Sequence, residues 1–313
     1  MVAAGWITLG CVLPSPALAQ DSLRPLRIGT EPSLLTEGSL GWLTLQPPPE
    51  VSLAGGEAFG EPIHVERRSD STVRALVGVP IETADSFRVT LFLRRAEELD
   101  TVVATLPVRK GGYPNEVLAV PPAFVKPDSA AAARIQSEVA KSREVSRRSQ
   151  ERQRLWRGPF RLPRSSRITS PFGSARVFNG EVQSRHLGTD FAGAIGAPVR
   201  AAGQGVVALV ADFYLAGRAV YIDHGAGLVT AYFHLSRADV RRGQTVVAGQ
   251  RIGAVGRTGR VTGPHLHWVA RYGAISVDPM SLLQLEQAHR PGVAKRTIRV
   301  AAPAPQATSP RLP

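Results

Sequence analysis

Two histidines stand at alternate positions in the run PHLHWV at 264–269. On a β-strand alternate side chains point to the same face, so His265 and His267 would lie side by side. A metal ion would give one of these imidazoles a strong ligand bond, which offsets the cost of removing it from water. Taken alone, the pair fits both metal binding and ordinary hydrogen-bonded histidines.

A third histidine and a carboxylate, His186 and Asp190, lie four positions apart further upstream. Nearby glycines and β-favouring residues indicate an extended or looped backbone that can turn both groups inward. With His267 they make a set of two imidazoles and one carboxylate, which matches a catalytic zinc that keeps its fourth position for water. The only cysteine is Cys11. It lies in a segment that we expect to be removed, so the mature chain would have no Cys-rich structural zinc site.

Two further histidines lie between these motifs. His234 falls in the alternating run AYFHL at 231–235, and we interpret it as a catalytic group or as a group that supports a ligand. His224 precedes a glycine, and we interpret it as a turn residue. Either ring could instead only hydrogen-bond the backbone.

Three motifs, taken in order, resemble the signature of the lysostaphin/LytM-type zinc metallopeptidases, metallopeptidase family 23. They are His186-x-x-x-Asp190, YFHLS at 232–236 and GRTGRVTGPHLH at 256–267. The similarity runs from about 168 to 279. The resemblance implies that His186, Asp190 and His267 bind one Zn²⁺ ion and that His265 and His234 are catalytic. It also implies that the substrate is a peptide bond in the stems or cross-links of peptidoglycan.

The resemblance also suggests how such a site would work. Zinc lowers the pKa of its bound water from about 16 to about 7. We expect His265 to take the proton of this water, and His234 to help hold the reacting carbonyl. Some members carry a tyrosine shortly before the first ligand, but no tyrosine occurs between Arg161 and Asp190. His234, the metal or another donor would have to fill that role.

Two other functions share parts of this pattern. Related domains that have lost metal ligands act as catalytically inactive regulatory modules, which activate other cell-wall hydrolases; here every ligand position is filled. The repeated glycine-rich segments are also similar to lipoyl or biotinyl carriers. A carrier needs a lysine for its cofactor, and none occurs between Lys141 and Lys295.

The remaining chain must position these groups, and its composition favours turns and short strands. Glycine and proline number 30 and 25 among 313 residues, which disfavours an all-helical bundle. Short runs at 63–66, 73–79, 87–93 and 101–108 alternate apolar and polar side chains. This period of two predicts half-buried strands. We therefore predict a mainly β protein that begins, at 20–127, with an accessory domain resembling an antiparallel β-sandwich.

Three segments follow this accessory domain. Asp128 or Ser129 can cap a helix that runs towards Trp156, and a thin apolar stripe among many basic residues predicts a solvated helical connector at 128–160. Residues 161–285 hold five of the seven histidines, and the similar segments at 202–207 and 248–253 predict a folded-over β metallopeptidase domain built from two like halves. We expect a disordered Pro-rich tail at 286–313. We also expect that the helical connector folds the strand domain back, so that this domain partly shields the active-site cleft.

The first nineteen residues carry no charged side chain and end in PALA before Gln20, which predicts a signal peptide at 1–19. The run before Cys11 fits a lipid-modified cysteine poorly. No later segment approaches the roughly 18 apolar residues of a membrane helix, so we expect no stable membrane insertion. The predicted location is the periplasm or the cell wall.

The formal net charge of +13 favours a polyanionic partner. Nucleic acid, acidic lipid and wall polymers all qualify by charge. No Lys/Arg run is interleaved with aromatic residues, which argues against nucleic acid. Peptidoglycan is thus the expected partner, and no sequence feature indicates an oligomeric state.

Overall fold

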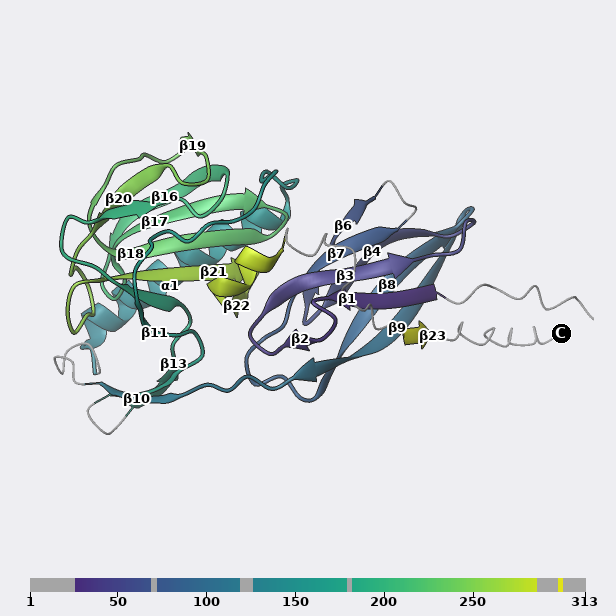
Figure 1. Ribbon diagram of the computed structural model, residues 1–313, viewed down its shortest axis with the longest axis horizontal. Coiled ribbons are helices and arrows are strands. Elements are labelled where there is room, and N and C mark those ends of the chain that lie inside the picture. The colour runs from purple at the N-terminus through teal and green to yellow at the C-terminus, as the bar shows by residue number, and fades with distance from the viewer. Residues whose placement is uncertain (1–25, 69–71, 119–125, 179–181, 286–297, 301–313) are drawn as a thin grey trace, which may run out of the picture.

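The computed structural model describes residues 26–68, 72–118, 126–178, 182–285 and 298–300. The predicted signal peptide at 1–19 and most of the predicted tail lie outside these residues. The described chain is mainly β, which confirms the predicted fold class, and forms two β units side by side (Figure 1). No helix in the described ranges has the length and apolarity needed to cross a membrane.

The N-terminal unit consists of two five-stranded sheets around one core. The first has the order β23-β1-β3-β7-β6, formed by β1 Leu26–Glu31, β3 Leu40–Gln46, β6 His64–Arg67, β7 Val73–Gly78 and β23 Ile298–Val300. The second has the order β2-β9-β8-β4-β5, formed by β2 Leu35–Thr36, β4 Ser52–Ala58, β5 Glu61–Pro62, β8 Ser86–Arg95 and β9 Glu98–Arg109.

The period-two runs of the sequence fall on strands β6 to β9. Along β8, buried and exposed side chains alternate, because one face covers the core and the other meets water. One expectation is wrong in part: Ile298–Val300 of the predicted tail pair with β1. An exposed edge strand offers unpaired backbone groups that even a polar segment can pair with.

The C-terminal unit is built on a ten-stranded sheet. Its main path is β11-β14-β21-β18-β17-β16-β19, and β15, β20 and β22 pair off this path. The bounds are β11 Ile168–Ser170, β14 Thr189–Ala192, β15 Pro198–Arg200, β16 Gly205–Phe213, β17 Gly217–Gly225, β18 Leu228–Ala238, β19 Thr245–Val246, β20 Arg251–Val255, β21 His265–Tyr272 and β22 Ile275–Val277. A 3₁₀ helix, η2 (Pro279–Gln284), follows.

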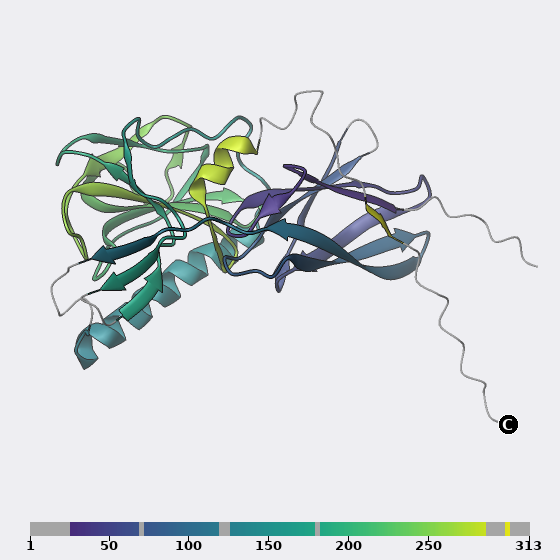
Figure 2. The same ribbon diagram turned by 60° about the horizontal axis from the view of Figure 1, so that its bottom comes forward.

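Helix α1 (Ser129–Gln150) begins where the sequence predicts, because Asp128 Oδ1 accepts the N–H of Ala131 at 2.8 Å. It ends before Trp156, whose side chain is buried in the core of the C-terminal unit. The helix packs along β16, β17 and β18 (Figure 2). The expectation of a solvated spacer is therefore wrong for one face, where Ser146 and Ser149 are buried. Small side chains let the helix approach the sheet closely.

A three-stranded sheet borders the C-terminal unit. It consists of β10 Asn115–Leu118, β12 Ala175–Phe178 and β13 Val182–Arg185, with β10 parallel to β12. The boundary expected at 127 therefore does not follow the sheets, since β10 pairs with a strand of the C-terminal unit. Parallel pairing between segments far apart in sequence leaves no local signal.

The two units also share buried contacts. Trp42 Nε1 donates to the Leu285 carbonyl at 2.9 Å, and Leu40, Trp42 and Leu76 belong to the core cluster of the C-terminal unit. His64 Nδ1 lies 3.0 Å from the Tyr272 hydroxyl. The sandwich is thus packed against the C-terminal sheet through apolar and polar side chains.

Candidate metal centre

Neighbouring strands bring the predicted site residues together. In the pairing of β14 with β21, Asp190 lies directly opposite His267 and Ala192 lies opposite His265. Residues directly opposite in an antiparallel pair project to the same face. His186 follows β13 and is fixed by a backbone hydrogen bond from its N–H to the Ser174 carbonyl at 2.8 Å.

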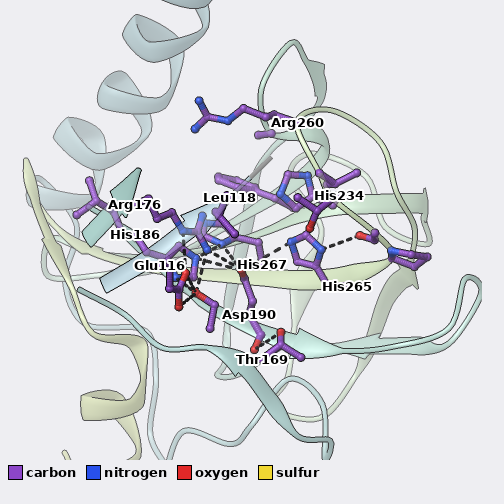
Figure 3. Close-up of a pocket in the computed structure, with 18 of the residues that line it drawn as sticks. Glu116, Leu118, Thr169, Arg176, His186, Asp190, His234, Arg260, His265 and His267 are labelled. Atoms are coloured by element: carbon purple, nitrogen blue, oxygen red, sulfur yellow. Dashed lines mark hydrogen bonds and ion pairs between the residues drawn. The ribbon is translucent and has the colours of Figure 1, made fainter. Parts of the chain in front are cut away.

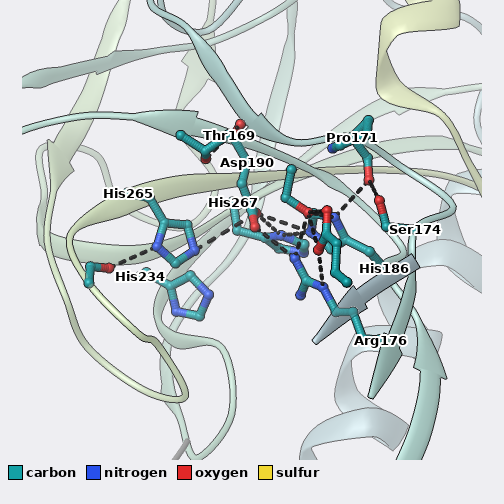
Figure 4. Close-up of polar contacts among 12 residues, drawn as sticks. Thr169, Pro171, Ser174, Arg176, His186, Asp190, His234, His265 and His267 are labelled. Atoms are coloured by element: carbon teal, nitrogen blue, oxygen red, sulfur yellow. Dashed lines mark hydrogen bonds and ion pairs between the residues drawn. The ribbon is translucent and has the colours of Figure 1, made fainter. Parts of the chain in front are cut away.

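Three side-chain atoms from these segments meet at one point (Figure 4). His186 Nε2 lies 3.1 Å from Asp190 Oδ1 and 2.9 Å from His267 Nδ1, and the third side, Asp190 Oδ1 to His267 Nδ1, is 2.6 Å. His186 and Asp190 are buried, and His267 is partly buried. The structure thus places the side chains of all three predicted ligands within reach of one another.

The His186 ring is held in one tautomer by its other nitrogen. Nδ1 lies 2.9 Å from the Pro171 carbonyl oxygen, which can only accept a hydrogen bond, so Nδ1 carries the proton. In the neutral ring Nε2 then presents a lone pair to Asp190 and His267. A metal-binding imidazole needs this orientation.

His265 and His234 are anchored in the same way. His265 Nδ1 donates to the Gly263 carbonyl at 2.8 Å, and His234 Nδ1 donates to the Thr258 carbonyl at 2.8 Å. Their ring centroids lie 4.8 Å apart, and His265 Nε2 is 3.8 Å from Asp190 Oδ1. Each neutral ring therefore has its unprotonated Nε2 available as a proton acceptor next to the ligand cluster.

An unusual backbone conformation brings His234 into the cleft. Its φ is +60°, a value that few residues other than glycine adopt. Phe233 and His234 are consecutive on β18, yet both line the same cleft, whereas strict alternation would send one of them to the opposite face. The sequence identifies His234 as a candidate but gives no sign of this distortion, which is a form of strain found at functional sites.

The electrostatics of the cluster suit a cation. Burial alone would raise the pKa of Asp190, but its interactions with His267 and His186 hold it far below its usual range. Burial lowers the pKa of His267 to about 4 and, together with the neighbouring His267 and His265, lowers the pKa of His234 to about 3. At neutral pH Asp190 is thus ionised, and His267 and His234 are neutral.

The donor set fits zinc. Ligands at about 2.0–2.2 Å in a tetrahedron lie about 3.3 Å from one another. The three observed separations, 2.6–3.1 Å, are slightly shorter, so each pair would move apart by roughly 0.2–0.7 Å around an ion. Two imidazoles and a carboxylate also leave one tetrahedral position for water or substrate.

The cluster lies in a cleft of about 790 Å³ (Figure 3). Arg167, Arg176 and Arg260 line it together with Glu116. Burial, followed by the charge of Arg176, lowers the pKa of Arg260. The cleft is large enough for several residues of an extended peptide and favours one that carries carboxylates.

His224 differs from its sequence interpretation. It lies on β17, not in a turn, and its side chain is fully buried. Nδ1 lies 2.7 Å from the Gln204 carbonyl and Nε2 lies 2.8 Å from Thr230 Oγ1. Both ring nitrogens are used inside the fold, so His224 supports the structure and does not enter the cleft.

Sequence reasoning also missed three polar residues beside the cluster, Glu116, Ser170 and Arg176. Ser170 stands within the similarity that begins at 168, so that motif could have drawn attention to it. Glu116 lies on β10, in the region assigned to the accessory domain, where nothing marks it.

Comparison with known proteins agrees with this geometry. A profile of peptidase family M23 matches residues 184–279. The peptidoglycan DD-endopeptidase ShyA of Vibrio cholerae is 54% identical over 105 residues, which are 33% of this chain and 24% of that relative. ShyC, a peptidoglycan DD-endopeptidase of the same organism, is 40% identical over 134 residues, 42% of this chain and 30% of that relative. The chain thus spans less than a third of either relative.

A solved structure is similar over both β units. The crystal structure of a candidate M23 peptidase from Pseudomonas aeruginosa superposes with a TM-score of 0.60 at 27% identity. The match covers 80% of this chain and 95% of that one.

Proposed function

We propose that this chain, whose residues 184–279 match peptidase family M23, is a zinc-dependent endopeptidase that hydrolyses peptide bonds in peptidoglycan stems or cross-links. The observation that carries this proposal is the meeting of His186 Nε2, Asp190 Oδ1 and His267 Nδ1, with all three atoms within 4.8 Å of one another. Relatives named as peptidoglycan DD-endopeptidases support the choice of substrate.

In this proposal His186, Asp190 and His267 hold one Zn²⁺ ion. When bound, zinc would supply a water with a pKa of about 7 and polarise the scissile carbonyl. The two histidine rings present neutral lone pairs to the ion, and Asp190 contributes the negative charge.

His265 is the proposed general base. Its Nδ1–H is fixed on the Gly263 carbonyl, so its Nε2 can take a proton from the attacking water and pass it to the leaving amine. His234, on β18, lies next to His265 beside the candidate ligands. Its Nε2 is proposed to accept a hydrogen bond from the attacking water or from the leaving amine. The His265 ring, whose centroid lies 4.8 Å away, helps to lower the pKa of His234.

The surroundings fit a wall peptide. The stem peptides of peptidoglycan carry carboxylates, and the cleft is lined by Arg167, Arg176 and Arg260. A net charge of +13 would hold the protein near an anionic wall polymer. We further propose that the protein is exported to the periplasm or the cell wall, and that 161–285 forms the catalytic unit together with β10.

The test is mass spectrometry of the muropeptides released from purified peptidoglycan by residues 20–313. The expected result is cleavage between amino acids, which stops with a chelator and returns when zinc is added. Protein that contains stoichiometric zinc but releases no peptide fragments would contradict the proposal. That result would favour a regulatory module without catalysis.

A further inference from the structure

A carboxylate from outside the matched family region lies beside the candidate ligands. Glu116 stands on β10, directly opposite Arg176 on β12 in the parallel pairing. Ser170 Oγ lies 2.8 Å from Glu116 Oε1 and 2.9 Å from Oε2, and Arg176 Nε lies 3.4 Å from Oε2 (Figure 3). The Glu116 and Arg176 side chains are 20% and 16% exposed, so water screens these contacts only in part.

Two chains of contacts lead from Glu116 to the ligands. Through Ser170, the first reaches His186, whose Nδ1 lies 2.8 Å from Ser170 Oγ. The second passes through Arg176, whose Nη2 donates to Asp190 Oδ2 at 2.8 Å (Figure 4). His186 and Asp190, the two candidate ligands that do not lie on β21, are thus both connected to Glu116.

The contacts through Ser170 fix which atom donates and which accepts. A serine hydroxyl has one proton, and a carboxylate can only accept. Ser170 therefore donates to Glu116, and its oxygen accepts from the Nδ1–H of His186. This arrangement holds the proton on Nδ1 and the lone pair on Nε2, which faces Asp190 and His267. The Pro171 carbonyl accepts from the same Nδ1–H. Without Glu116 the Ser170 hydroxyl could turn, and the Nδ1–H would lose one of the two acceptors that hold it in place.

The second set of contacts, through Arg176, orients the carboxylate of Asp190. Arg176 occupies Asp190 Oδ2, so Oδ1 is left to face the two histidines at 3.1 and 2.6 Å. The negative charge of Glu116 opposes the positive charge of Arg176 and so limits how strongly Arg176 withdraws Asp190 from a metal ion.

We propose that Glu116 is a positioning residue of the metal centre, which helps to hold the Nδ1–H of His186 through Ser170 and orients Asp190 through Arg176. The inference rests on the proposed function. It means that residues 184–279 do not form a complete site, because β10 supplies part of the support. Carboxylates that support metal-binding histidines commonly change metal affinity by about 10–100-fold when removed.

The experiment measures zinc affinity of the full mature chain, residues 20–313, by competition with a chromophoric chelator. Glu116→Ala is expected to bind zinc about 10–100-fold more weakly. Glu116→Gln keeps an acceptor oxygen for Ser170 and should recover most of this loss. Thermal unfolding of the metal-free proteins should change little, because Glu116 is a partly exposed side chain at a sheet edge.

Glu82→Gln provides the matched control. Glu82 is also paired with an arginine, Arg185 at 2.9 Å, but it is 68% exposed and no contact with a ligand side chain is described for it. Its zinc affinity should equal that of the unsubstituted chain. A Glu116→Ala affinity within twofold of this control overturns the inference and leaves the proposed function intact. An equal loss in Glu116→Ala and Glu116→Gln overturns the role assigned to Ser170, since the acceptor oxygen would then be irrelevant. Absence of zinc binding by the unsubstituted chain overturns both.

Discussion

Gly188 must remain a glycine if His267 is to reach its partners. A Cβ atom at this position would lie 2.5 Å from His267 Cε1, 2.7 Å from His267 Nε2 and 2.7 Å from the Trp268 carbonyl oxygen. Ordinary contacts begin at 3.4 Å. Both neighbours belong to β21, which pairs with β14. In the Gly188→Ala variant residue 188 and His267 must therefore move apart by about 0.9 Å.

Such a shift exceeds what a metal centre tolerates, because ligand distances hold within about 0.2 Å. We expect Gly188→Ala to bind zinc at least about 10–100-fold more weakly and to lose about 1–3 kcal/mol of unfolding free energy from overpacking. Chelator competition and denaturant unfolding measure the two effects. Gly158→Ala is the control, since nothing lies within 4 Å of its added Cβ. Zinc affinity of Gly188→Ala equal to that of this control would refute the steric argument.

Four other substitutions separate ligands, base and structural support. His267→Ala should lose zinc, whereas His265→Ala should keep it and lose about 10²–10⁴-fold in peptidoglycan hydrolysis; metal analysis beside turnover checks both, and retained zinc in His267→Ala would contradict the ligand assignment. Burial lowers the pKa of His224 from 6.5 to about 4, so the unfolded chain binds protons first as the pH falls. The stability associated with this residue, complete above pH 6.5, should decrease by about 3 kcal/mol towards pH 4. His224→Gln should flatten the dependence of the unfolding midpoint on pH, and an unchanged slope would count against it. Trp42→Phe leaves the buried Leu285 carbonyl without its donor and should cost about 1–3 kcal/mol in denaturant unfolding; an unchanged free energy would show that this contact is not needed.

Local patterns identified much of the fold. The alternation of apolar and polar side chains located β8 and β9, because half-buried strands impose a period of two. Asp128 marked the start of α1 through its capping side chain. The end of the helix was not predicted, because burial of Trp156 in a distant core overrides the helical preference of the residues before it.

The candidate site was also predictable only in part. The types and order of His186, Asp190 and His267 pointed to metal binding, and the structure brings them within reach of one ion. The positive φ of His234 is a property of the sheet distortion and not of the residue type. Glu116 lies 54 positions from Ser170, and only the parallel pairing of β10 with β12 places it there, so no spacing rule could have indicated it.

The central claim is that two imidazoles and one carboxylate jointly bind a single zinc ion. Anomalous diffraction at the zinc absorption edge, from crystals of residues 20–313, tests it most directly. The account predicts one peak within about 2.0–2.2 Å of His186 Nε2, Asp190 Oδ1 and His267 Nδ1. A zinc peak bound elsewhere, or crystals grown with zinc that show no peak between these three atoms, would contradict it.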